Sequence, residues 1–142
     1  MNPELIYKKV KRVFPRSLAH KLPKTVRVVL IHKETSRMLN ARFRKKRKPT
    51  NVLSFRYDAT YGEILLCPPV IRAEARTQGN TYAFQMTWMI VHGMIHLSGL
   101  HHEYSRIFAG KVARVEHEIL SALGREKMKK LKIKMQNKST KF

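Results

Sequence analysis

Three histidine positions at the end of a long apolar stretch have the spacing of a metal site. His92 and His96 are four residues apart, which places both imidazoles on one face of a helix. Gly99 then allows a tight turn, and a further histidine follows. Three neutral imidazole nitrogens that converge in this way are typical ligands of a divalent ion. A catalytic zinc ion with three protein ligands keeps a position for water, whose pKa it lowers from about 15.7 to about 7. The pattern therefore predicts a hydrolytic metal centre.

The third ligand is one of two adjacent histidines whose side chains point in different directions. We expect His102 to bind the metal. His101 would then orient a phosphate, hydrogen-bond to a metal ligand or face the solvent. The pattern is similar to the His-Glu-x-x-His motif of zinc proteases, but Gly93 stands where their general-base glutamate stands. A protease of that type is not expected, and a histidine cluster without a metal is the structural alternative.

The charge of the chain points to a polyanionic partner. The 142 residues hold 30 Lys and Arg against 9 Asp and Glu, a formal net charge of +21. A surplus of this size usually reflects binding to nucleic acid, with an anionic membrane surface as the second choice. Apolar residues make up 43% of the chain, which is ordinary for a folded protein. We expect one soluble domain with a core of its own.

Cysteine usage and apolar run lengths bear on the compartment. Cys67 is the only cysteine, so an internal disulfide is impossible; a reducing compartment fits best, and Cys67 is expected to fill the core. No uninterrupted apolar run reaches the ~18 residues of a membrane span. The N-terminus has no apolar core of a secretory signal, and its basic start is only loosely similar to a transit peptide. We expect a cytoplasmic protein without a membrane partner, with an organelle as the alternative.

Apolar periodicity predicts the elements that position the histidines. Helices are expected at residues 3–14, 34–43, 68–78, 81–97 and 107–123, with Gly79, Gly99 and Gly124 at helix ends. Strands are expected at residues 26–31, 52–55 and 63–67, the last two as a hairpin. The predicted fold class is α/β (α+β), a single domain with a small mixed β-sheet packed by about five helices. The metal site would lie at the end of the central helix, behind the sheet.

Two segments carry much of the basic charge. Residues 42–48 hold six Lys and Arg and no acid, and Pro49 follows them, so we expect a loop. Sequence-independent contacts to a nucleic-acid backbone are expected there from Arg42, Lys45, Lys46, Arg47 and Lys48. Residues 125–142 hold eight basic residues and one acid. We divide the chain into a metallohydrolase domain, residues 1–124, and a basic, flexible tail, residues 125–142, for which a merely solvated role is the alternative.

Four blocks of the chain, in order, resemble the YbeY family. They are residues 39–44 (LNARFR), 48–55 (KPTNVLSF), 62–64 (GEI) and the motif His92-Gly93-x-x-His96-Leu97-x-Gly99-x-x-His102. That family comprises metal-dependent endoribonucleases of rRNA maturation and ribosome quality control. The resemblance covers about residues 26–124 and implies a zinc ion, or another divalent metal, held by His92, His96 and His102. It also implies that Arg44 is the essential arginine.

Three features depart from the family pattern. Position 101 is usually an aspartate in the family and is His101 here. The acid after Gly62 is commonly an aspartate and is Glu63 here, which could shift a hydrogen bond. The family's usual first strand is missing because the chain opens almost directly into a helix, so we expect the sheet to lack an edge.

The residues and the resemblance lead to the same reaction. A metal-activated water could attack a phosphodiester, and the planar guanidinium of Arg44 would stabilise the charge that builds on the phosphate. A 2′-hydroxyl nucleophile, with the metal as Lewis acid only, is the open alternative. The predicted function is a single-strand-specific, zinc-dependent endoribonuclease of rRNA processing.

The expected partners are rRNA, the ribosomal small subunit and, as further candidates, ribosomal proteins or assembly GTPases. The rival prediction is a non-catalytic rRNA-binding assembly factor with a structural metal. A hydrolase of a small substrate or peptide is disfavoured by Gly93 and by the charge.

Overall fold

A three-stranded mixed sheet organises the part of the chain that the structure describes. The structure is a computed structural model and describes residues 1–100 and 106–139. Its strands are β1 (Thr25–Leu30), β2 (Val52–Arg56) and β3 (Tyr61–Leu66), in the order β1-β3-β2. β1 runs parallel to β3, and β2 runs antiparallel to it. The predicted hairpin between the last two strands is therefore confirmed.

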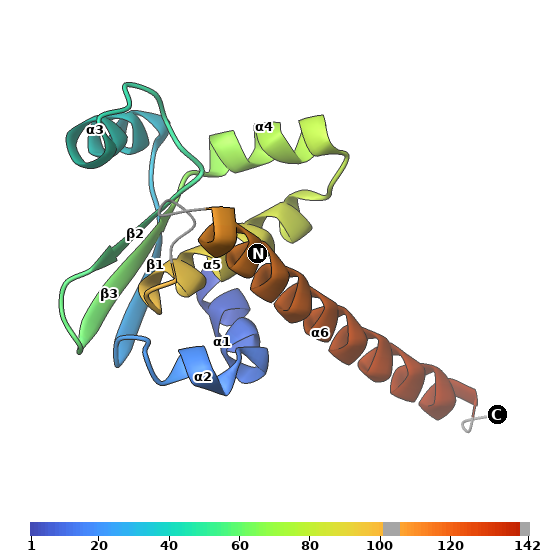
Figure 1. The fold of residues 1–142 in the computed structure, drawn as a ribbon. Helices are drawn as coiled ribbons and strands as arrows, with labels where there is room; N and C mark the ends of the chain where they lie inside the picture. Colours follow the sequence, from blue (N-terminus) through green and yellow to red (C-terminus); the bar gives the residue numbers. More distant parts are fainter. Residues whose placement is uncertain (101–105, 140–142) are drawn as a thin grey trace.

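Six helices accompany the sheet within the described residues. They are α1 (Pro3–Val13), α2 (Arg16–Ala19), α3 (Lys33–Arg44), α4 (Pro68–Gln78), α5 (Tyr82–Leu97) and α6 (Arg106–Ser139). α5 packs against β2 and β3, and α1 and α6 pack on α5, as Figure 1 shows. Five of these helices match the predicted ones; the short α2 was not predicted. The expected small α+β domain is confirmed.

The core lies between the sheet and α5. Its fully buried side chains include Ile64 and Leu66 of β3 and Ile90, Met94 and Ile95 of α5. Cys67 is also fully buried, as expected of a core residue. Each of these larger side chains contributes roughly 1.5–3 kcal/mol when it is removed from water. The core therefore holds α5, with its histidines, firmly against the strands.

Gly93 allows α5 to approach the sheet closely. A Cβ atom at this position would lie 3.0 Å from Ile64 Cγ2 and 3.2 Å from Ser54 Oγ. The Ser54 hydroxyl donates to the Gly93 carbonyl at 3.3 Å, which marks the same contact. A glutamate side chain would have to occupy the space that Ile64 and Ser54 fill. The close packing at Gly93 thus agrees with the expectation that the site is not that of a zinc protease, whose general-base glutamate would stand at this position.

α5 ends where the sequence predicted. The N–H of Gly99 donates to the His96 carbonyl, and the N–H of Leu100 donates to the Ile95 carbonyl. Together with the positive φ of 93° at Gly99, these bonds form a Schellman motif. The helix therefore ends one residue after the second histidine. The same motif ends α4 at Gly79, whose φ is 71°.

Two predicted boundaries are wrong. Residues 42–44 belong to the last turn of α3, so Arg44 lies on a helix, and the irregular segment begins with Lys45, whose φ of 57° is left-handed. α6 continues through Gly124 to Ser139 instead of ending at Gly124. An interior glycine costs a helix only about 1 kcal/mol, and the Arg, Glu, Lys, Met and Leu residues that follow are strong helix formers. Propensity therefore outweighs the glycine.

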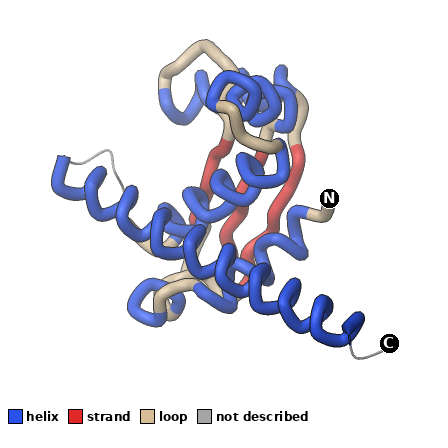
Figure 2. Tube along the Cα trace, turned by 90° about the vertical axis from the view of Figure 1, so that its right-hand side faces the viewer, coloured by secondary structure: helices blue, strands red, loops and turns tan. Residues whose placement is uncertain are grey.

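The second half of α6 extends beyond the body of the domain, as Figure 2 shows. Its apolar side chains Met128, Leu131, Ile133 and Met135 are exposed. The flexibility of residues 125–142 stays a prediction. Among the described helices, none combines the length and apolar character that a bilayer span needs.

The two edges of the sheet are treated differently. At the β1 edge, the Val28 N–H donates to Glu4 Oε1 of α1 at 3.0 Å. Within the described residues, a side chain of α1 and not a further strand bonds to the backbone at this edge. The β2 edge pairs with no strand in residues 1–100 and 106–139. This second edge forms the wall of the main cavity of the domain.

Candidate active site at the open edge of the sheet

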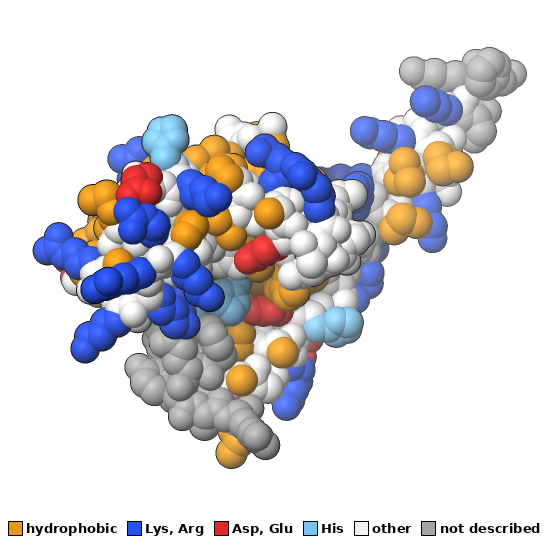
Figure 3. Space-filling model, turned by 90° about the horizontal axis from the view of Figure 1, so that it is seen from above, with side chains coloured by type: hydrophobic (Ala, Val, Ile, Leu, Met, Phe, Trp, Pro, Cys, Tyr) orange, Lys and Arg blue, Asp and Glu red, His pale blue; other side chains and the backbone are white. Residues whose placement is uncertain are grey.

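A cavity of about 820 Å³ runs along β2, between α3 and the second half of α5. This volume lies within the roughly 300–1,000 Å³ typical of ligand sites. All five β2 residues line it, together with His92 and His96 and the cationic side chains Lys21, Arg44, Lys46, Lys48 and Arg56. Figure 3 shows a histidine and an acidic side chain in a hollow with Lys and Arg around it. Histidines and cations that are distant in sequence thus share one pocket.

The backbone of β2 also faces this cavity. Tyr57 donates its N–H to the Tyr61 carbonyl, and Cys67 donates to the Asn51 carbonyl. In an antiparallel pair, every second residue of a strand bonds to the partner strand. The backbone groups of Leu53 and Phe55 therefore point toward β3, like those of Asn51 and Tyr57. The N–H and C=O of Ser54 therefore point to the unpaired edge. They offer one donor and one acceptor to a ligand in the cavity.

His92 is oriented by a buried carboxylate from α6. Its Nδ1 lies 2.5 Å from Glu116 Oε1, and the indole N–H of Trp88 donates to Glu116 Oε2 at 2.7 Å. Glu116 is only 8% exposed. A carboxylate on one imidazole nitrogen is the usual arrangement behind a metal-binding histidine, because it fixes the tautomer and leaves the other nitrogen for the metal. The donor set of His92 therefore fits a metal ion.

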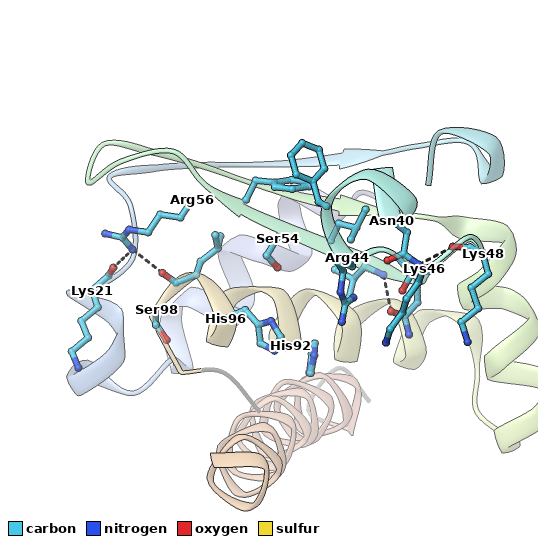
Figure 4. Close-up of a pocket in the computed structure, with 18 residues that line it drawn as sticks. Lys21, Asn40, Arg44, Lys46, Lys48, Ser54, Arg56, His92, His96 and Ser98 are labelled. Atoms are coloured by element: carbon cyan, nitrogen blue, oxygen red, sulfur yellow. Dashed lines mark hydrogen bonds between the residues drawn. The ribbon is translucent and has the colours of Figure 1, made fainter. Parts of the chain in front are cut away.

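His96 lies beside His92 on the same face of α5. The two ring centroids are 4.3 Å apart, as the predicted spacing of four residues requires. Figure 4 shows both histidines and Arg44, which come from α5 and α3, in the same pocket. The third expected ligand, His102, and its neighbour His101 lie outside the described residues. Within the described ranges, no group of three His, Cys, Asp or Glu side chains that could hold a metal is found.

Hydrogen bonds from α3 hold the segment that follows Arg44. The Ser36 hydroxyl donates to the Thr50 carbonyl at 2.8 Å and accepts from the Thr50 N–H at 2.9 Å. Asn40 donates from Nδ2 to the Lys48 carbonyl at 2.7 Å. These bonds fold residues 45–50 back onto the helix and bring Lys46 and Lys48 to the cavity. Among the described residues, the buried Asn40 Oδ1 has no hydrogen-bond partner.

Arg56 acts as a structural clamp at the other end of the cavity. Its Nη1 donates to the carbonyl of Lys21 at 2.6 Å and to that of Leu97 at 2.7 Å. Leu97 is the last residue of α5, and a cation there also favours the negative end of the helix dipole. Arg56 thus fixes the end of the helix that carries His96.

The structure divides the predicted basic contacts into two groups. Lys46 and Lys48 line the cavity with Arg44, whereas Arg42, Lys45 and Arg47 do not and are exposed. The Arg42 guanidinium lies over the Phe43 ring, 5.4 Å from its centroid.

Glu63 lies outside this cavity. It accepts a hydrogen bond from the Tyr57 hydroxyl at 2.7 Å, which raises the pKa of Tyr57. The carboxylate of Glu63, where the resemblance leads us to expect an aspartate, thus bonds to a tyrosine.

Glu116, Arg56 and the aromatic lining of the cavity were not predicted. One signal could have identified Glu116: it occupies the buried face of α6 with Val112 and Ile119, at positions i, i+4 and i+7. A carboxylate on an apolar helix face is rarely buried without a partner. The roles of Arg56 and Phe55 depend on contacts between segments far apart in the sequence, and no local pattern marks them.

Comparisons with known proteins identify relatives of the chain. The family model described as "Endoribonuclease YbeY" matches residues 3–124. A relative of that name from Burkholderia lata is 41% identical over 102 residues, which cover 68% of this chain and 59% of the relative. Another, from Thermotoga neapolitana, is 31% identical over 112 residues, 72% of this chain and 75% of that protein. The match thus spans less than two thirds of the Burkholderia lata relative.

The fold also matches a solved structure. The solution structure of TM1509 from Thermotoga maritima aligns with a TM-score of 0.56 at 25% identity. The alignment covers 87% of this chain and 84% of that one. With the family model matched over most of its length, the chain belongs to the YbeY family.

Proposed function

We propose that the protein is a zinc-dependent endoribonuclease that cleaves single-stranded RNA at the open edge of its sheet. The observation that carries the proposal is the meeting of Arg44, His92 and His96 in one cationic cavity. The name endoribonuclease, which the family model and the curated relatives carry, supports the same reaction. A small substrate or a peptide would not need the several cations that line the cavity, among them Arg44, Lys46 and Lys48.

The residues that would hold the metal are His92, His96 and His102. His92 fits this role because Glu116 fixes its Nδ1, and His96 lies beside it. For His102, the only support is its spacing from His92 and His96 in the sequence. When bound, zinc supplies Lewis-acid chemistry for phosphodiester cleavage.

The other steps belong to the side chains of the cavity. Arg44 would donate two hydrogen bonds from its planar guanidinium to the scissile phosphate and stabilise the charge that develops on its oxygens. Lys46 and Lys48 would bind the phosphates on one side and give the complex a steep salt dependence. The nucleophile is a water molecule or the 2′-hydroxyl of the substrate.

For the setting in the cell, we propose rRNA processing in the cytoplasm, with the ribosomal small subunit as the partner. The support is the role that the family resemblance implies and the net charge of +21, which suits an RNA-rich assembly. Ribosomal proteins and assembly GTPases are the candidate protein partners.

The proposal is tested by two arginine variants that lose the same charge at opposite edges of the sheet. Arg44→Ala removes a cation of the cavity, whereas Arg27→Ala removes an exposed cation of β1. We expect kcat/KM for a single-stranded RNA to fall roughly 100- to 1,000-fold in Arg44→Ala. In Arg27→Ala, kcat/KM should stay within a factor of about two. Arg27 does not line the cavity, and the loss of one cation outside the site weakens binding of a polyanion only slightly.

Two results would contradict the proposal. The first is equal loss in both variants, which would mean that only overall charge matters. The second is binding of RNA without any cleavage by the unaltered, zinc-loaded protein. That outcome would favour the rival, a non-catalytic rRNA-binding factor.

A further inference from the structure

Two phenylalanines line the same cavity as the histidines. Phe43 is the residue before Arg44 on the last turn of α3, and Phe55 lies on β2. Their ring centroids are 5.1 Å apart with an interplanar angle of 66°, an edge-to-face pair. Such a pair engages the face of only one ring and the edge of the other. Because the Arg42 guanidinium also lies over the Phe43 ring, the aromatic surface left for a ligand is the part of Phe43 that stays exposed.

Phe43 is unusually exposed for a phenylalanine in a lined cavity. It is 56% exposed in spite of its contact with Phe55. Burying a side chain of this size is favourable, yet Phe43 does not belong to the buried core. A large apolar ring that stays in solvent beside a binding cavity suits a ligand with a flat, apolar face.

Positive charge surrounds this aromatic pair. The Arg42 guanidinium lies 5.4 Å from the Phe43 ring centroid, and Arg44, Lys46 and Lys48 line the cavity. A ligand for this combination has a flat ring and phosphates on either side of it. A nucleotide of an RNA strand has both, because every base has a π face and every sugar links two phosphates.

The other exposed aromatic side chains provide a comparison. Tyr57 stacks with Tyr61 at a centroid distance of 5.5 Å, but its hydroxyl is bonded to the carboxylate of Glu63. Phe84 lies 6.3 Å from Trp88 on α5. Neither Tyr57 nor Phe84 lines the cavity. Phe43 thus combines an exposed ring with cavity cations and with proximity to Arg44.

We propose that Phe43, backed by Phe55, is a stacking platform for one unpaired base next to the scissile phosphate. In a duplex both faces of each base are covered by neighbouring bases, so only a single strand can place a base on this ring. The platform would therefore select single strands before any cleavage takes place. This inference rests on the proposed RNA substrate and explains how the site distinguishes single strands from duplexes.

Binding measured in the presence of chelator tests the platform apart from cleavage. The full chain would be titrated with a fluorescent single-stranded oligoribonucleotide and with a strand of equal length that lacks bases. Phe43→Leu removes the aromatic face but keeps an apolar side chain. Phe84→Leu is the matched control, the same change at an exposed phenylalanine outside the cavity, and Phe43→Tyr restores the ring.

We expect Phe43→Leu to weaken binding of the normal strand roughly tenfold, because the stacking of one base on the ring is lost. Binding of the abasic strand should be unchanged, and Phe43→Tyr and Phe84→Leu should bind both strands like the unaltered protein. The platform is wrong if Phe43→Leu binds the normal strand with full affinity. It is also wrong if Phe43→Leu or Phe43→Tyr weakens binding of the normal strand and of the abasic strand by the same factor. Because chelator is present, a chain that binds with this pattern but never cleaves would contradict the proposed function alone.

Discussion

The unpaired backbone groups at the two edges of the small sheet have different surroundings. An edge strand carries unpaired N–H and C=O groups that invite association with another chain. At the β1 edge, a carboxylate of α1 takes up one of them, the Val28 N–H, through Glu4. At the β2 edge, the backbone borders a cavity lined by Arg44, Lys46 and Lys48. The β1 edge, called the closed edge below, is bonded by a carboxylate. The β2 edge, called the open edge, is bordered by cationic side chains.

This difference shows where a ligand can be bound. Lysine and arginine along an edge discourage another strand, yet they leave the edge open to a polyanion. The cations at β2 therefore serve both purposes. The closed edge contributes to stability, and the open edge is the side on which catalysis is proposed. Variants at the two edges should consequently have different effects.

The larger effect is expected behind the open edge, at Glu116. Its two oxygens serve Trp88 and His92 at once, and a glutamine amide has only one oxygen that can accept. Glu116→Gln should therefore weaken zinc affinity roughly 10- to 100-fold. Competition with a chromophoric chelator measures the affinity directly, without any cleavage assay.

Glu118 provides the control for this prediction. It lies on the same helix and is exposed, so Glu118→Gln should leave zinc affinity unchanged. Equal affinity in the Glu116→Gln variant and the unaltered protein would show that the carboxylate does not orient a metal ligand.

The smaller effect is expected at the closed edge. Glu4→Ala leaves the Val28 N–H without its carboxylate and removes an acid from the first turn of α1. We expect a loss of about 1–2 kcal/mol in the free energy of unfolding, measured by urea denaturation. RNA cleavage should be unchanged at temperatures where the variant is folded. If Glu4→Ala kept full stability but cleaved RNA more slowly, the closed edge would contribute to catalysis and not to stability, which contradicts the account of the two edges.

Local patterns predicted the parts of the site that lie on one element. The spacing of His92 and His96 places both rings on one face of α5, and Gly99 ends that helix because it can adopt a positive φ. Short apolar runs, rich in β-branched residues and separated by turn residues, predicted the strands and the hairpin. These features depend only on the helix and strand periods and on the conformational freedom of glycine.

Contacts between distant elements were not predictable in the same way. Glu116 reaches His92 across 24 residues of chain, and Arg56 reaches the end of α5 across 41. Gly124 predicted a helix end, but the strong helix formers that follow it continue α6 to Ser139. Arg44 was expected on a loop because six basic residues share its segment, whereas α3 continues to Arg44 and the Lys45 N–H donates to the Asn40 carbonyl at the helix end. Contacts between distant elements decided the roles of Glu116 and Arg56, whereas helix propensity and a local C-cap bond decided where α6 and α3 end.

The measurement that tests the central claim most directly is metal-dependent cleavage of a single RNA in its unpaired and paired forms. The full chain would be incubated with an end-labelled single strand, with chelator, and with chelator followed by excess zinc; the same strand annealed to its complement would be incubated in parallel. The account predicts that the single strand is cut, that chelator stops cleavage, that zinc restores it, and that the duplex stays intact. Cleavage at an unchanged rate in chelator would contradict the assignment of His92 and His96 to a catalytic metal at the open edge.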